Sequence, residues 1–397
     1  MAKIEVDGIY KIFGPKANSH LGSVKAGMSK EQLLEDTGHT LGLNNINLRI
    51  EEGELFVIMG LSGSGKSTLI RHFNRLIDPT AGTIRIDGEE MIALKQADLI
   101  ERRRNKMSMV FQRFALFPHK TVLDNVGYGL HIQGVAKVEA RKKAQYWLEQ
   151  VGLKGVGDQY PHQLSGGMQQ RVGLARALAT DPDILLMDEA FSALDPLIRK
   201  EMQDLLMQLQ QRLHKTIVFI THDLEALRLG NRIAILKDGA LVQQGDPQDI
   251  LLNPSTDYVA AFVRDVNRGK VLTAHHVMAM PQATLTTRTS VEKARQWMID
   301  QGFDYATVLE GKSLVGIVTL SDLQNADGEI GALVKDVVCV PESADLESLL
   351  PQMIRDNVPL AVTSDKGEFR GWVSRDRVVD LVSTDQQGNA AKDSFAG

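Results

Sequence analysis

The segment GLSGSGKST at residues 60–68 restricts the fold more than any other part of this sequence. It matches G-x-x-x-x-G-K-[ST], a loop whose glycines let backbone N–H groups close around phosphate oxygens. The unbroken apolar run LFVIM at 55–59 precedes it, and the apolar spacing in STLIRHFNRLI at 67–77 predicts a helix after it. Strand, glycine loop and helix in this order indicate a nucleotide-binding α/β domain. We expect that helix to bury one face, made of Leu69, Ile70, Phe73, Leu76 and Ile77.

Lys66 and Ser67 carry the chemistry of this loop. The Lys66 ammonium can reach the β and γ phosphates, and the Ser67 hydroxyl can ligate Mg²⁺. The run ILLMDE at 184–189 adds a buried strand that ends in two carboxylates. Asp188 suits a second contact to Mg²⁺, and Glu189 suits a base for the attacking water. A solvated acidic pair is the alternative, and the two motifs fit kinases, GTPases, helicases and transporters alike.

The order of apolar runs predicts a mostly parallel sheet. Short apolar runs alternate with helical patterns from Leu55 to about Leu236, which is typical of βαβ units. The runs LFVIM, ILLM and TIVFI lack polar alternation, as expected for strands that are covered on both faces. Asp-Gly turns in TIRIDGEE and RIAILKDGALV predict hairpins. We therefore expect an antiparallel β flap beside the α/β core.

Two segments lie outside this pattern. Residues 15–42 read as an insertion, in which Ser29 is the predicted N-cap of a short helix, Gln32 its capping-box partner and Gly38 its stop. From about Lys270 a weak internal repeat begins, in which YATVLEGKSLVGIVTLSDL resembles LAVTSDKGEFRGWVSRDRV. Each copy reads as strand, polar turn, strand and a Gly-x-x-Thr/Ser turn into a helix. Two copies predict one pseudo-symmetric module, because a solenoid needs at least three.

Length and composition predict a soluble globular protein of two or three domains, with 397 residues, 43% hydrophobic and 24% charged. The net charge of −5 provides no general reason to expect a nucleic-acid partner. The single cysteine, Cys339, excludes an internal disulfide, and we expect a buried thiol in a reducing compartment. No apolar run approaches the ~18 residues of a membrane span, and MAKIEVDGIY lacks the apolar core of a signal peptide.

The segment LSGGMQQR at 164–171 decides among the P-loop families. Its two glycines open a helix and form a second anion-binding turn. The segment resembles the signature sequence of ATP-binding cassette (ABC) ATPases. Other motifs follow in the family's order: Gln112 resembles the glutamine loop, SALD at 192–195 the D-loop, and His222 the switch histidine.

The resemblance covers about residues 1–255 and implies a homodimer. In this family two subunits meet head to tail, and the signature helix of one chain covers the γ-phosphate on the P-loop of the other. Hydrolysis of ATP, bound with Mg²⁺, then requires dimerisation. Phe13 falls where the family stacks an aromatic ring on adenine, with Tyr10 as the alternative and a core role as a further reading of either.

The resemblance also assigns roles to individual residues. The expected catalytic residues are Lys66, Gln112, Glu189 and His222. The expected Mg²⁺ contacts are Ser67, Gln112 and Asp188. The expected nucleotide contacts are Phe13, Gly60, Ser62, Gly63, Ser64, Gly65, Lys66, Ser67, Thr68, Gln112, Ser165, Gly166, Gly167, Asp188, Asp195 and His222, with the signature residues acting on the partner's nucleotide.

Four features together resemble the ATPase subunits of importers for glycine betaine, proline betaine and choline. They are the insertion, Leu61 within the P-loop, the segment MDEAFSALDPLIR and the C-terminal repeats, which resemble tandem CBS domains. Ala190 stands where most cassettes have proline, a feature we associate with this subgroup. The segment THDLEALRLG is one residue shorter than usual after His222, which leaves the register of the following helix open.

CBS domains often bind adenine nucleotides. The first repeat reads GIVTLSD, so Thr319 and Asp322 are the candidate contacts for the phosphate and ribose of a regulatory nucleotide. The second reads GWVSRDR, with Arg377 at the aspartate position and Asp376 one residue early, so this copy reads as degenerate. A purely structural pair of repeats is the alternative.

We expect an ABC ATPase that energises the import of quaternary-amine osmolytes through a separate transmembrane permease. A solute-binding protein is an indirect partner, and the expected location is peripheral, on the cytoplasmic face of the bacterial inner membrane. The segment RFALFPHKTVLDNV, which follows Gln112, is expected to meet the permease with exposed aromatic side chains, and partial burial of these side chains in the helical subdomain is the alternative. An importer for amino acids or polyamines is the alternative. A DNA-repair ABC protein would carry a long coiled coil between the P-loop and the signature, and a translation factor would contain two cassettes. This sequence has no such heptad pattern and contains each motif once, which disfavours both classes.

The expected fold is a P-loop ABC ATPase domain, with a mostly parallel sheet, an antiparallel β flap and a helical subdomain, followed by a tandem CBS α/β module. The expected boundaries are 1–262 for the ATPase domain, with about 114–180 as its helical subdomain, 263–272 for a linker, 273–384 for the CBS module and 385–397 for a flexible tail.

Overall fold

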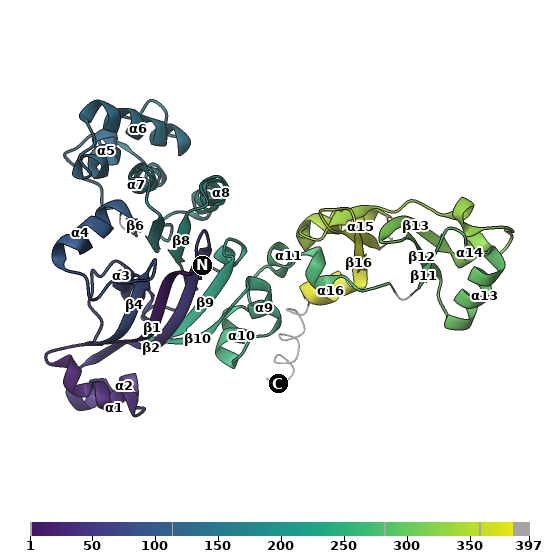
Figure 1. The fold of residues 1–397 in the computed structure, drawn as a ribbon, viewed down its shortest axis with the longest axis horizontal. Helices are drawn as coiled ribbons and strands as arrows, with labels where there is room; N and C mark the ends of the chain where they lie inside the picture. Colours follow the sequence, from purple (N-terminus) through teal and green to yellow (C-terminus); the bar gives the residue numbers. More distant parts are fainter. Residues whose placement is uncertain (1, 113, 282, 357–358, 384–397) are drawn as a thin grey trace, which may run out of the picture. The chain divides into compact units, whose positions relative to one another are not determined.

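The computed structural model describes residues 2–112, 114–281, 283–356 and 359–383 (Figure 1). These residues form two compact units, which divide between Val263 and Arg264. The predicted tail at 385–397 lies outside the described residues. Among the helices that the structure describes, none combines the length and apolar character needed to cross a membrane.

The core of the first unit is a six-stranded sheet with the order β10-β9-β3-β8-β7-β6. All neighbouring pairs are parallel except β10 with β9, which follow one another through the predicted Asp-Gly turn. The mostly parallel sheet is therefore confirmed. Its strands are β3 (Leu55–Met59), β6 (Met107–Phe111), β7 (Ile184–Asp188), β8 (Thr216–Ile220), β9 (Arg232–Lys237) and β10 (Ala240–Gly245).

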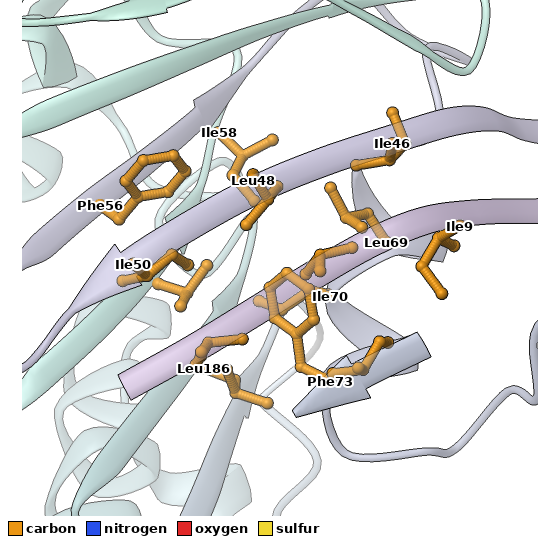
Figure 2. Packing of buried hydrophobic residues seen from close by; sticks show 14 of the residues in the cluster. Ile9, Ile46, Leu48, Ile50, Phe56, Ile58, Leu69, Ile70, Phe73 and Leu186 are labelled. Carbon is orange, nitrogen blue, oxygen red and sulfur yellow. The ribbon is translucent and has the colours of Figure 1, made fainter. Parts of the chain in front are cut away.

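A second sheet of antiparallel strands, ordered β2-β1-β4-β5, is the predicted flap. Its last two strands, β4 and β5, are joined by a turn at Asp87 and Gly88, and both residues have the positive φ that an Asp-Gly hairpin requires. Helix α3 packs beneath it, and Figure 2 shows side chains of both sheets and of α3 gathered in one apolar cluster. The flap strands are β1 (Ala2–Phe13), β2 (Thr40–Glu51), β4 (Ala81–Ile86) and β5 (Glu89–Glu90).

Helix α3 (Lys66–Phe73) is shorter than the sequence predicts. Leu69, Ile70 and Phe73 are fully buried as expected, but Leu76 is 52% exposed. The chain turns at Arg75, whose φ of 52° is left-handed and ends the helical path. The apolar spacing continued past the point where the backbone leaves the helix, so the prediction for Leu76 was wrong.

A group of helices around one apolar cluster forms the segment that was predicted as a helical subdomain (Figure 1, blue). Its helices are α5 (Val122–Ile132), α6 (Lys137–Gln150), the short 3₁₀ helix η2 (Pro161–Gln163) and α7 (Gly166–Ala179). The remaining helices of the first unit are α4 (Gln96–Asn105), α8 (Pro196–Leu213), η3 (Leu224–Arg228), α9 (Pro247–Leu252) and α10 (Asp257–Phe262).

The insertion connects β1 to β2 and is folded. It contains η1 (Ala17–His20), α1 (Leu21–Lys25) and α2 (Lys30–Thr37). The predicted capping box of α2 is present, because the Ser29 side chain accepts from the Gln32 N–H while the Gln32 side chain accepts from the Ser29 N–H. Gly38 ends the helix at φ 71°. Strand β2 already starts at Thr40, so the insertion ends before the predicted residue 42.

The second unit repeats one small topology. Two three-stranded sheets, β11-β12-β13 and β14-β15-β16, each contain a parallel first pair and an antiparallel second pair. A Cβ at Gly316 would lie 2.2 Å from the Lys335 carbonyl oxygen, and one at Gly371 would lie 2.7 Å from the Ala279 oxygen. In both repeats, therefore, a neighbouring segment approaches the last strand of the sheet so closely that only glycine fits at this position.

The strands of the second unit are β11 (Thr284–Leu285), β12 (Tyr305–Glu310), β13 (Ser313–Thr319), β14 (Cys339–Pro341), β15 (Leu360–Thr363) and β16 (Phe369–Val373). Its helices are α11 (Arg268–Val271), α12 (Ala274–Val277), α13 (Val291–Gln301), α14 (Leu320–Leu323), η4 (Ile330–Leu333), α15 (Leu346–Asp356) and α16 (Arg375–Ser383).

The expectation of a buried Cys339 was wrong, and the stretch predicted as a linker at 263–272 has structure of its own. It includes helix α11, and Leu272 is fully buried in the apolar cluster of the second unit. The apolar residues of this stretch make it part of the domain. Cys339 is exposed, because it lies in the short strand β14 with its side chain directed away from that cluster's buried residues.

Candidate nucleotide-binding site

The motifs of the first unit meet at one edge of the parallel sheet. The P-loop follows β3, His222 follows β8, and Asp188 ends β7. These strands are neighbours in the order β3-β8-β7 and run parallel, so their carboxyl ends lie side by side. Phe111 pairs with Asp188, which brings Gln112 to the same edge from β6. An edge of this kind is the usual ligand site of open α/β sheets.

Lys66 is held inside the P-loop. Its Nζ donates to the carbonyl oxygens of Gly60 at 2.8 Å and Leu61 at 3.0 Å, and its residue is 4% exposed. Burial lowers the pKa of the Lys66 ammonium, and the Glu189 carboxylate, 3.7 Å from Nζ, opposes that shift. A nearby polyphosphate would oppose it further. The buried cation is therefore poised for an anionic ligand.

Ser67 and Asp188 form a hydroxyl–carboxylate pair that fits a magnesium ion. The Ser67 Oγ donates to Asp188 Oδ1 at 2.7 Å. Proteins commonly hold Mg²⁺ through one or two such oxygens, with the remaining ligands from phosphates and water. The second carboxylate oxygen of Asp188 accepts from the Arg71 guanidinium at 3.1 Å.

Arg71 is a site residue that the sequence reading missed. It lies one helical turn after Ser67 on α3, so both side chains lie on the same face and reach Asp188. The i, i+4 spacing was the available signal. In this structure Arg71 neutralises the carboxylate that is expected to contact the metal.

Glu189 lies between Lys66 and His222. Its Oε2 is 3.6 Å from the Nδ1 of His222, and its backbone N–H donates to the Ile220 carbonyl at 3.1 Å. Glu189 has a φ of 47°, a left-handed conformation that is uncommon for a residue other than glycine. The bend directs the carboxylate from the strand end toward the P-loop lysine. Backbone strain of this kind is concentrated at functional sites.

The segment after His222, which the sequence left open, forms the 3₁₀ helix η3 at residues 224–228, with Asp223 as its N-cap. A 3₁₀ helix rises about 2.0 Å per residue against 1.5 Å in an α-helix, so fewer residues span a given distance. The Asp223 carboxylate is fixed by Gln203, which donates to it at 2.9 Å. The residue next to His222 is thereby anchored to α8.

Phe13 and Tyr10 differ in their availability. Phe13 is 39% exposed, and one edge of its ring packs against Gly42. A Cβ on Gly42 would lie 2.6 Å from this ring, so glycine leaves room for it. Tyr10 packs against the insertion's apolar cluster, with the Lys25 ammonium over its ring. An exposed ring at the end of β1 suits stacking on a base, so the structure favours Phe13 over Tyr10.

The signature segment opens helix α7, and the D-loop opens helix α8. The Ser165 side chain accepts from the Met168 N–H as the N-cap of α7, and Asp195 accepts from the Ile198 N–H as the N-cap of α8. A Cβ on Gly167 would lie 2.7 Å from Ile198, so glycine is needed where the two helix starts pack. The hydrogen bonds described for Ser165 and Asp195 are local and none reaches the P-loop.

The remaining P-loop residues build its curved backbone. Gly60, Gly63 and Gly65 have positive φ values of 147°, 79° and 98°. A Cβ on Gly65 would lie 2.6 Å from the Gly42 carbonyl oxygen, so the loop fits tightly against β2. The other predicted nucleotide contacts in this loop and at the signature turn are Ser62, Ser64, Thr68 and Gly166.

The aromatic residues after Gln112 are partly buried, which was the alternative to full exposure. Phe114 and Phe117 are half-buried. The Phe117 ring packs on Tyr128 with centroids 4.5 Å apart, and its backbone bonds to Asn125. The helical subdomain thus covers part of a segment that was predicted to be free for a partner.

In the second unit, the first repeat's polar pair is engaged internally. Thr319 Oγ1 donates to Asp322 Oδ2 at 2.5 Å, and the Lys335 ammonium donates to Oδ1 at 2.8 Å. A separate cavity of about 330 Å³ is lined by residues of both repeats, and Ser374 is its contribution from the turn after β16. Asp304, Tyr305, Thr307 and Trp372 also line this cavity.

Comparison with protein families matches residues 43–192 to the ABC transporter family and residues 328–384 to the CBS domain. The chain is 49% identical to the glycine betaine/carnitine transport ATP-binding protein GbuA of Listeria monocytogenes, over 96% of this chain and 98% of that protein. It is 47% identical to the glycine betaine transport ATP-binding protein OpuAA of Bacillus subtilis, over 96% and 92%.

The fold is also found among solved structures. A post-hydrolysis dimer of an ATP-binding cassette bound to ADP and phosphate is 35% identical to this chain. The match has a TM-score of 0.53 and covers 62% of this chain and 98% of that one. The predicted α/β fold is confirmed by this likeness. With relatives that align over nearly their whole length, the chain belongs to the ATP-binding subunits of ABC transporters, a family of ATPases that dimerise and work with a permease.

Proposed function

We propose that this chain hydrolyses ATP to drive import of a quaternary-amine osmolyte such as glycine betaine. The names of its relatives from Listeria and Bacillus, which specify glycine betaine transport, support this solute class. The chain acts as a homodimer at the cytoplasmic face of the inner membrane, bound to a transmembrane permease. A solute-binding protein delivers the osmolyte on the opposite side and does not touch this chain.

The contacts described above support the following roles for the site residues. The Lys66 ammonium and the loop N–H groups neutralise the β and γ phosphates, and Ser67 and Asp188 hold Mg²⁺ with Gln112 nearby. The ion neutralises charge on the phosphates when bound. Glu189 orients and deprotonates the attacking water, and His222 contacts the γ-phosphate. Catalysis is then positioning and electrostatics.

The completing residues come from the second subunit. Ser165, Gly166 and Gly167 at the start of α7 face the partner's γ-phosphate, and Asp195 lies beside them at the start of α8. The free N–H groups of a helix start favour an anion. Phe13 stacks on adenine in the chain's own site.

The arrangement of Lys66, Glu189 and His222 carries this proposal, because the Glu189 carboxylate lies within 3.7 Å of both the Lys66 ammonium and the His222 imidazole. Glu189→Gln keeps the shape of the side chain and removes its basicity. In proteoliposomes with the permease, it should lower ATP turnover and glycine betaine uptake on the order of 10²-fold or more. ATP binding should persist and closed dimers should accumulate on gel filtration with ATP and Mg²⁺. Turnover near that of the unmodified chain would contradict the role of Glu189.

We further propose that the second unit regulates the ATPase through a ligand in the cavity beside Ser374. The polar groups of Thr319 and Asp322 already bond to each other and to Lys335, so they are less suited to an adenine nucleotide than the sequence implied. A cavity of about 330 Å³ is at the lower end of the size range for small-molecule sites. Aromatic walls from Tyr305 and Trp372 would suit a nucleobase.

A further inference from the structure

The insertion places a second lysine at the P-loop. The Nζ of Lys30 donates to the carbonyl oxygen of Gly63 at 3.4 Å. The same nitrogen lies 3.9 Å from Oδ1 of Asp238, in the turn between β9 and β10. The Lys30 side chain is 29% exposed. One ammonium group thus connects three segments that are far apart in the sequence.

The position of Lys30 is set by its helix. Lys30 is the first residue of α2, directly after the N-cap Ser29, whose capping box fixes the start of the helix. One turn later Leu33 is fully buried in the apolar cluster of the insertion. At the end of the insertion, His39 Nε2 lies 2.8 Å from the Pro15 carbonyl and holds both ends together. The side chain therefore starts from an ordered backbone.

The P-loop is held from the same side by backbone contacts. The Gly239 N–H, from the β9–β10 turn, donates to the Ser64 carbonyl at 3.1 Å, and the Asn44 N–H donates to the Gly239 carbonyl at 2.8 Å. Lys66 binds the carbonyls of Gly60 and Leu61 in the first part of the loop. Lys30 binds the Gly63 carbonyl, two residues further along the loop. The ammonium groups of Lys66 and Lys30 therefore both bind carbonyl oxygens of the same short loop.

We propose that Lys30 is a positioning residue of the nucleotide site, supplied by the insertion. It fixes the Gly63 peptide and adds positive charge beside the β and γ phosphates of ATP. The inference rests on the proposed ATP site and explains what the insertion contributes to it. Because Lys30 is partly exposed, salt should screen its attraction, as the Debye length falls from ~10 Å at 0.1 M to ~3 Å at 1 M.

The test compares Lys30→Gln, Lys30→Arg and the matched control Lys16→Gln in the full-length chain. Lys16 lies in the same insertion and is exposed, so its loss changes the net charge equally. Equilibrium binding of ATP and AMP is measured from 0.05 to 1 M salt. At low salt, Lys30→Gln should weaken ATP binding about two- to fivefold, a range set by exposed charge interactions. AMP should lose less, the ATP difference should shrink at high salt, and Lys30→Arg should restore most of the affinity.

Lys66→Ala separates failure of this inference from failure of the nucleotide site. If Lys66→Ala abolishes ATP binding while Lys30→Gln behaves like Lys16→Gln, the site stands and the role of Lys30 is wrong. Equal losses for ATP and AMP, or a loss that does not depend on salt, would also overturn it, because both indicate a structural defect. If Lys66→Ala leaves ATP binding intact, the nucleotide site itself is misplaced.

Discussion

His72 is a buried imidazole on the helix that follows the P-loop. Its residue is 1% exposed, and its Nδ1 lies 2.6 Å from the Thr68 carbonyl oxygen. Burial lowers the pKa of His72, with a smaller contribution from the Lys11 ammonium, while the Thr68 bond and Asp78 oppose the shift. A neutral histidine therefore supports the packing of α3.

The pH dependence of stability follows from that shift. In the unfolded chain the imidazole titrates near its ordinary pKa of about 6.5, and in the folded chain it titrates lower. Below about pH 6.5 the unfolded chain binds more protons, so the free energy of unfolding should decrease as the pH falls toward the folded pKa. His72→Leu should make this slope shallower between pH 5 and 6.5 in urea unfolding. The exposed His119→Gln is the control, and an unchanged slope in His72→Leu would rule out this origin.

At the scale of elements, one side chain organises the segment between Gln112 and α5. Asn125 is fully buried on α5. Its Oδ1 accepts from the Phe117 N–H at 2.8 Å, and its Nδ2 donates to the carbonyls of Phe117, Lys120 and Thr121. The segment that we expect to meet the permease is thus shaped by a single amide.

Asn125→Ala should disrupt this segment more than the nucleotide site. Removing the amide leaves several buried backbone groups without partners, at a cost of about 3 kcal/mol in the free energy of unfolding. ATP binding by the isolated chain should persist, while co-purification with the permease should fall. Asp124→Asn, at the exposed neighbouring position, should change neither. Full permease assembly by Asn125→Ala would contradict the proposed contact.

At the scale of the whole molecule, the chain consists of two units that fold around separate apolar clusters. The division lies after Val263, which is itself buried. A cut placed later, after Arg268, would leave part of α11 without the cluster that Leu272 joins. The structure therefore places the clean truncation at residue 263.

Residues 1–263 alone should keep ATP hydrolysis and lose its regulation by salt or adenine nucleotides. The core and the site motifs lie within this unit, so its activity does not need the second one. The assay is ATP turnover with the permease in proteoliposomes over a salt series, with and without adenine nucleotides. Ser374→Arg in the full chain, which fills the cavity, should remove only the nucleotide response. A truncated chain with an unchanged salt and nucleotide profile would leave the second unit without a regulatory role.

The sequence by itself determined the features that depend on neighbours along the chain. The strand and loop before Lys66, the start of the helix after the loop, the Asp-Gly turns and the capping box of Ser29 and Gln32 all formed as predicted. In each case a few adjacent residues supply both the backbone preference and the hydrogen-bonding groups. The apolar spacing gave a wrong prediction at Leu76, because the left-handed turn at Arg75 ends the helix before that residue.

Only the tertiary structure decided which distant groups meet. The strand order β3-β8-β7 brings Lys66, His222 and Glu189 together, and the sequence motifs do not encode that order. The contact of Lys30 with Gly63 and the position of the second unit's cavity beside Ser374 were equally hidden. Such contacts depend on register and on what each surface buries, and these are properties of the packed chain as a whole.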